Sequence, residues 1–117
     1  MIKAVLVDYG HGNIFSVKSA LDYLGYKLDF DLDGSKIGSG DLLIIPGVAE
    51  FKTGIQSLIQ RNQYQKIKEA KQSNKPIVGL CLGAQILLEN SQESPNVKGF
   101  GFIKGKVIQL QNSSSQR

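Results

Sequence analysis

The sequence lacks the features of a secreted, membrane-spanning or nucleic-acid-binding protein. A single cysteine among 117 residues cannot form an intramolecular disulfide, which predicts a reducing compartment, the cytoplasm. No apolar run approaches the roughly 18 to 20 residues of a membrane helix, and the first run, residues 2–7, is too short and too directly followed by Asp8 to be a signal sequence. Aromatic residues do not interleave with the lysines, so the net charge of +4 predicts no nucleic-acid partner.

What the sequence does contain is an alternation of strand-like and helix-like segments. With 41% hydrophobic and 21% charged residues, it predicts one globular domain. Strands separated by helices predict an α/β fold with a doubly wound, mostly parallel sheet and helices on both faces. The expected strands are residues 2–8, 26–32, 42–45, 76–78 and 102–108; the expected helices are 14–24, 51–73 with a break near Asn62, and 84–89. We expect a short connector at 37–40, a loop at 91–98 and a frayed polar tail at 109–117.

The only cysteine occupies a distinctive position, within Gly79-Leu80-Cys81-Leu82-Gly83. A strand that turns sharply into a helix strains the residue at the bend, and small residues two positions before and after it let the neighbouring segments approach. The following helix is expected to direct unpaired N–H groups at the sulfur, which favours the thiolate. Cys81 is therefore the candidate nucleophile, at the bend of an interior strand. The alternative is a buried structural thiol.

Three loops are predicted to meet at the carboxyl ends of the strands, where chemistry gathers in doubly wound sheets. They are residues 9–13, residues 46–50 and the bend at Cys81. For Gly10, Gly12 and Asn13 an ordinary strand-to-helix turn is the alternative explanation.

These motifs carry a family resemblance. Asp8-Tyr9-Gly10-His11-Gly12-Asn13, Ile44-Ile45-Pro46-Gly47-Val48-Ala49-Glu50-Phe51 and Gly79-Leu80-Cys81-Leu82-Gly83-Ala84-Gln85 resemble the glutaminase subunits of imidazole glycerol phosphate synthase, which are class I glutamine amidotransferases of histidine biosynthesis. The resemblance extends from the first strand to about Val107. It implies hydrolysis of L-glutamine through a cysteine thioester, without a metal or another cofactor. It also implies a heterodimer in which ammonia passes to a cyclase subunit.

The resemblance also implies roles for individual residues. Cys81 would be the nucleophile, and the N–H of Leu82 one oxyanion donor. A second donor would come from the loop of Gly47, Val48 and Ala49, in which Gly47 also lets the backbone approach the substrate. Gln85 would hold the amino-acid end of glutamine. Asn13 would lie near the partner interface.

The sequence departs from the family pattern at two points. Ala49 stands where the family usually has a glycine, and alanine resists a positive φ. The family's catalytic histidine and glutamate come from a C-terminal segment that residues 1–117 do not include. We therefore interpret the sequence as a single partial amidotransferase domain that carries the nucleophile without its base. His11, the only histidine, is either an exposed loop residue or a substitute base.

Three functions stay open. The chain is a glutaminase subunit, an inactive remnant that binds a cyclase-like partner, or a different cysteine enzyme on a similar fold. Within the first, a subunit that supplies ammonia for modifying the sugars of surface polysaccharides is an alternative to histidine biosynthesis. A partial sheet is also expected to expose an edge and an apolar face, which predicts low solubility.

Overall fold

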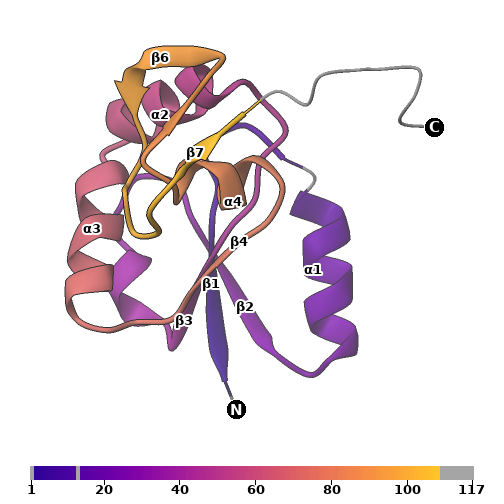
Figure 1. The fold of residues 1–117 in the computed structure, drawn as a ribbon. Helices are drawn as coiled ribbons and strands as arrows, with labels where there is room; N and C mark the ends of the chain where they lie inside the picture. The colour runs from indigo at the N-terminus through magenta and orange to yellow at the C-terminus, as the bar shows by residue number, and fades with distance from the viewer. Residues whose placement is uncertain (1, 13, 109–117) are drawn as a thin grey trace, which may run out of the picture.

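The centre of the molecule is a four-stranded parallel sheet. The computed structural model describes residues 2–12 and 14–108 (Figure 1). The strands lie in the order β2-β1-β3-β4, and every neighbouring pair is parallel. Their bounds are β1 (Lys3–Val7), β2 (Lys27–Asp31), β3 (Leu42–Ile45) and β4 (Ile77–Gly79). The predicted parallel sheet is confirmed: β1 and β2 are one residue shorter at each end than predicted, β3 has the predicted bounds, and β4 is shifted by one residue.

Helices cover both faces of this sheet, as predicted. Helix α1 (Ile14–Tyr23) lies on one face, and α2 (Phe51–Gln60) and α3 (Tyr64–Gln72) lie on the other (Figure 1). Successive residues of a strand point to opposite faces, so Ala4 and Leu6 of β1 pack towards α1 while Val5 and Val7 pack towards α2 and α3. The predicted break in the second helical stretch is also confirmed, because Asn62 has a φ of 61° between α2 and α3.

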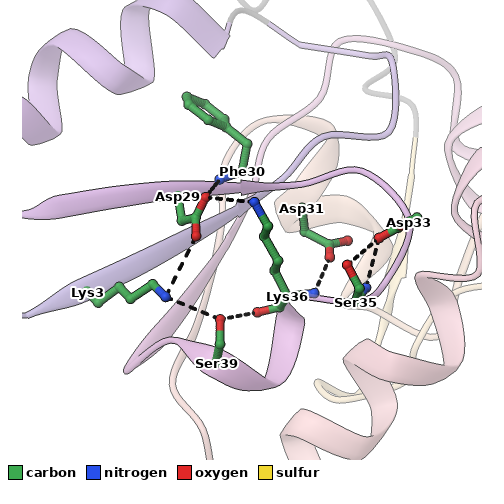
Figure 2. A network of polar contacts seen from close by, with 8 residues as sticks. All are labelled: Lys3, Asp29, Phe30, Asp31, Asp33, Ser35, Lys36 and Ser39. Atoms are coloured by element: carbon green, nitrogen blue, oxygen red, sulfur yellow. Dashed lines mark hydrogen bonds and ion pairs between the residues drawn. The ribbon is translucent and has the colours of Figure 1, made fainter.

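A polar turn connects β2 to the short 3-10 helix η1 (Ile37–Ser39) (Figure 2). Asp31 is fully buried at its start, and its carboxylate accepts hydrogen bonds of 2.8 Å from the backbone N–H groups of Gly34 and Lys36. The side-chain amide of Gln63, from the α2–α3 connection, donates a third bond of 3.0 Å to the same carboxylate. A buried carboxylate thus satisfies the backbone of the turn and ties it to the helical layer.

The C-terminal third differs from the prediction. The expected loop at 91–98 and the expected strand at 102–108 are replaced by a second sheet in the order β6-β5-β7. Its strands are β5 (Asn90–Ser91), β6 (Ser94–Lys98) and β7 (Lys106–Val107). The long last strand was wrong because Gly105 has a φ of 126°, which interrupts the extended segment, and only Lys106–Val107 form a strand. Helix α4 (Leu82–Ile86) begins and ends earlier than the predicted 84–89.

Strand β4 lies at an edge of the four-stranded sheet, not in its interior as predicted. Beside it, an apolar groove of about 460 Å³ runs between α1 and the strands β3 and β4, lined among others by Leu21, Ile44, Val78 and Leu80. Val78 is 44% exposed and Leu80 39% exposed. The predicted open edge and uncovered apolar face are therefore present in the described part of the chain.

The described residues contain neither a membrane-spanning helix nor a cluster of metal-binding side chains. No helix there is long and apolar enough to span a membrane. No group of three or more His, Cys, Asp or Glu side chains is arranged to hold a metal ion in the same part of the chain.

Candidate active site

Cys81 lies at the bend between β4 and α4, and its backbone is strained. Its φ is 56° and its ψ is −120°, a combination that L residues rarely adopt. The side chain is exposed, so the alternative of a buried structural thiol is excluded. The predicted strand-to-helix bend thus carries an accessible sulfur at a strained position, the geometry typical of a nucleophile elbow.

The two glycines around the bend are required sterically, as predicted. A Cβ on Gly83 would overlap the carbonyl oxygen of Ile45 in the neighbouring strand. A Cβ on Gly79 would lie 2.5 Å from the Gly83 carbonyl oxygen and 2.7 Å from Ala84 Cα, closer than real Cβ atoms approach. The bend is therefore packed directly against β3, which fixes the position of Cys81 relative to the sheet.

The three predicted loops meet at the carboxyl edge of the sheet. A Cβ on Gly12 would lie 3.2 Å from the nitrogen of Gly47, so the first loop contacts the second. The second loop contacts the bend, because the N–H of Leu82 donates a hydrogen bond of 3.0 Å to the carbonyl oxygen of Gly47. Gly47, which has a φ of 153°, is therefore in contact with both the first loop and the bend. The backbone of residues 46–48 therefore lies between the first loop and the residue that follows the thiol.

The N–H groups at the start of α4 are not unpaired, which corrects the prediction for the helix terminus. Leu82 donates to Gly47, Gly83 donates to Leu80, and Ala84 and Gln85 both donate to the carbonyl of Cys81. With five residues, α4 also has a small macrodipole. An oxyanion near the sulfur could use the Leu82 N–H only after the Gly47 carbonyl has turned away.

The remaining predicted site residues lie as follows. Gln85 is exposed on α4, one turn beyond the thiol. Val48 is 72% exposed, and Ala49 is half-buried against the core. Ala49 is not among the positive-φ residues of the described ranges 2–12 and 14–108. Asn13 and the predicted tail 109–117 fall outside the described residues.

His11 has a partner other than the thiol. Its Nε2 lies 2.8 Å from the hydroxyl oxygen of Ser57 on α2, and its ring packs edge-on against Tyr9 with centroids 5.6 Å apart. It is half-buried, which differs from the exposed loop histidine that one interpretation predicted. These contacts direct the imidazole towards α2.

Sequence reasoning gave no role to two residues that shape this site. Tyr9 is 1% exposed, and its hydroxyl donates a hydrogen bond to the Pro46 carbonyl. Glu93 accepts a bond of 2.9 Å from the N–H of Phe51, which begins α2 directly after the Gly47 loop. An aromatic residue directly after a buried strand was the available signal for Tyr9. Glu93 has no local signal, because it reaches α2 from the β5–β6 turn.

Comparison with known proteins identifies the family. A model of the CobB/CobQ-like glutamine amidotransferase domain matches residues 6–113. The chain belongs to this family of glutamine amidotransferases. Curated relatives of this amidotransferase domain are named imidazole glycerol phosphate synthase subunit HisH. The Symbiobacterium thermophilum protein is 37% identical over 110 residues, which are 94% of this chain and 52% of that protein. The Sulfurimonas denitrificans protein is 41% identical over 108 residues, 92% of this chain and 52% of that protein.

This amidotransferase domain spans about half the length of the curated relatives it matches. Solved structures agree on the fold. A crystal structure of a glutamine amidotransferase superimposes with a TM-score of 0.71 at 21% identity, over 83% of this chain and 51% of that chain. A putative peptidase E protein from Listeria monocytogenes superimposes with a TM-score of 0.63 at 21% identity, over 76% of this chain and 50% of that chain.

Proposed function

We propose that this chain is the nucleophile-bearing part of a glutaminase that hydrolyses L-glutamine to glutamate and ammonia. The observation that carries the proposal is the exposed Cys81 at a φ of 56° on a strand-to-helix bend, in a chain of the glutamine amidotransferase family. A strained residue persists where the surrounding structure holds it, and such positions cluster at reacting groups.

The proposed chemistry begins at the sulfur. The Cys81 thiolate attacks the carboxamide carbon of glutamine and forms a C–S bond, so that the carboxamide oxygen becomes an oxyanion. Collapse of this intermediate expels the nitrogen, which takes up a proton and leaves as ammonia, and water then hydrolyses the thioester to glutamate and free thiol. Gln85 lies one turn along α4, where it would hold the amino-acid end of the substrate.

The oxyanion requires a change in the Gly47 loop. The Leu82 N–H is the donor next to the nucleophile, and it is now bonded to the Gly47 carbonyl. If the peptide between Gly47 and Val48 turned over, it would release this N–H and bring the N–H of Val48 to the same side; Ala49 is the other candidate for the second donor. Donors of this kind typically change the rate by about 10²–10³ each.

The proton transfers need a base that we place outside residues 1–117. His11 contacts Ser57 and Tyr9, so we do not assign it this role. A thiolate without its base forms the thioester slowly, because removing one member of a cysteine or serine triad costs several orders of magnitude in rate.

The relatives named as subunits of imidazole glycerol phosphate synthase support the rest of the proposal. We propose that the ammonia passes to a cyclase subunit in a cytoplasmic heterodimer of histidine biosynthesis, with Asn13 near the interface. An ammonia supply for the sugars of surface polysaccharides is the alternative, and only the partner distinguishes the two.

The test uses a glutamine-derived chloromethyl ketone, which alkylates a thiolate with loss of chloride. We expect stoichiometric labelling at Cys81 that excess L-glutamine suppresses and that Cys81→Ser abolishes. Labelling that glutamine does not affect would indicate a different cysteine enzyme. A chain that is not labelled but still binds the cyclase subunit would be a partner-binding remnant, and the proposed activity would be wrong.

A further inference from the structure

Tyr9 lies directly beneath the loop that the proposed oxyanion site depends on. It follows β1 by two residues and is buried between the Gly47 loop and α2. Its hydroxyl donates to the Pro46 carbonyl. Its ring is so close to Gly47 that a Cβ there would overlap the hydroxyl oxygen, and a Cβ on Gly54 of α2 would lie 3.6 Å from the ring.

The contacts of the loop divide between two successive peptide groups. The Pro46 carbonyl belongs to the peptide that joins residues 46 and 47, and Tyr9 holds it. The Gly47 carbonyl belongs to the next peptide, and its partner is the Leu82 N–H at 3.0 Å. Because each carbonyl has a different partner, the second peptide can turn while the first stays in place. Gly47 joins them, and glycine tolerates the large changes in ψ that such a rotation requires.

We propose that Tyr9 is a positioning residue for the oxyanion loop. Its hydroxyl anchors the peptide between Pro46 and Gly47, so that the rearrangement which frees the Leu82 N–H is confined to the single peptide between Gly47 and Val48. The inference rests on the proposed glutaminase function.

Tyr9 is itself firmly held. The side-chain amide of Gln63 donates to the carbonyl of Asp8, the residue before Tyr9, at 3.1 Å, and to the carbonyl of Asp31 at 3.0 Å. The N–H of Asp8 donates to the same Asp31 carbonyl at 2.8 Å. On the other side, the ring of His11 packs edge-on against Tyr9. These hydrogen bonds connect Tyr9 to the polar turn of Figure 2 through Gln63 and the backbone of Asp31.

The hydroxyl also keeps its proton. Burial raises the pKa of Tyr9 well above its ordinary value of 10.0, so the group is a neutral donor throughout the physiological range. Pro46 is also buried, and among the described contacts the Tyr9 hydroxyl is the one hydrogen-bond donor to its carbonyl oxygen.

The test replaces Tyr9 by phenylalanine, which removes the hydroxyl and keeps the ring. The 117-residue chain is treated with the glutamine chloromethyl ketone and, separately, with iodoacetamide. We expect Tyr9→Phe to lower the maximal labelling rate by the chloromethyl ketone about tenfold, since an oxyanion donor is no longer placed correctly. The ketone concentration for half-maximal rate and the iodoacetamide rate stay within about twofold, because the exposed thiol and the substrate contacts do not change.

Tyr64→Phe is the matched control. Within residues 2–12 and 14–108, Tyr64 is the other tyrosine with a hydroxyl contact to a carbonyl, 3.5 Å from that of Gly99, and its ring stacks on Phe100. This variant is expected to leave both rates unchanged. An unchanged chloromethyl ketone rate in Tyr9→Phe, or an equal fall in both rates, would overturn the proposal. If the unmodified chain shows no glutamine-suppressed labelling, the proposed function fails first, whatever Tyr9 does.

A second measurement needs no variant. Hydrogen exchange of the unmodified chain compares the amide of Leu82, bonded to Gly47, with the amide of Leu80, bonded to Ile45 at 2.9 Å. These two bonds lie on either side of the Pro46 anchor. We expect the Leu82 amide to exchange at least about tenfold faster, through local opening of one peptide. Equal protection would mean that the loop opens as one unit, and the proposal would be wrong.

Discussion

The backbone strain at Cys81 predicts that glycine is more stable than alanine at this position. Neither variant has the sulfur, so the comparison isolates the conformation. A non-glycine residue in a rare region of φ and ψ costs about 1–3 kcal/mol, and Cys81 is at φ 56° and ψ −120°. Glycine avoids this cost but loses about 0.5–1 kcal/mol through the greater entropy of its unfolded state.

The difference gives an advantage of about 1 kcal/mol for Cys81→Gly over Cys81→Ala. The Cys81 side chain is exposed, so no large burial term enters. For a domain of 117 residues this corresponds to a rise of about 4 °C in Tm. Urea unfolding measures the effect as a higher midpoint at an unchanged slope.

Ala84→Gly is the control, because Ala84 is exposed within α4, three residues beyond the bend. In a helix, glycine is less stable than alanine by about 1 kcal/mol. The two pairs should therefore show opposite signs. If glycine were less stable than alanine at both positions, the backbone at Cys81 would be ordinary, and the elbow geometry that supports the nucleophile would be refuted.

Three further predictions follow from the packing and the polar turn. Gly83→Ala is expected to lower the unfolding free energy by more than about 3 kcal/mol, because the added Cβ overlaps a strand carbonyl. The control is Gly38→Ala, whose Cβ would have no atom within 4 Å and which should change the unfolding free energy by less than about 0.5 kcal/mol. Equal urea midpoints for the two variants would contradict this prediction. Asp31→Ala leaves the backbone N–H groups of Gly34 and Lys36 without their acceptor, while the Gln63 amide keeps its two backbone acceptors. The variant is expected to cost about 2 kcal/mol or more in urea unfolding, and a loss below about 1 kcal/mol would show that the turn does not depend on this carboxylate. The Phe30 N–H and the Lys36 side chain hold the pKa of Asp29 below its ordinary value of 3.8, so the stability that ionised Asp29 contributes is present above that value and is lost as the pH falls through the lower folded pKa. Asp29→Asn should therefore reduce the fall of Tm at acid pH. Parallel curves of Tm against pH for the variant and the parent would contradict the assignment.

The sequence predicted the parallel sheet and the bend because both depend on local, repeated signals. The apolar runs of β1 and β3 are nearly continuous, as expected of strands covered on both faces. The two glycines around Cys81 predicted a tight bend packed against neighbouring backbone, and a Cβ on Gly83 would indeed overlap the strand carbonyl. Asn62 has a positive φ and marks the helix break.

The parts that were not predicted depend on contacts between distant residues or on the orientation of a single peptide. Strand β6 (Ser94–Lys98) contains a proline and mostly polar residues, and only its pairing with β5 makes it a strand. The hydrogen bond from Leu82 to Gly47 joins residues 35 positions apart and depends on which way one carbonyl points. No local pattern contains that information, so the state of the oxyanion loop required the structure.

The position of β4 links two properties of the molecule. Residues 77–79 form an edge strand of the sheet, and they also determine the position of the thiol, because Cys81 follows this strand after one residue. A further strand that paired with the free edge of β4 would form hydrogen bonds with its backbone. These bonds would restrict the motion of the residues just before the bend. Strand pairing at the edge of the sheet would therefore also affect the mobility of Cys81, which lies two residues beyond β4.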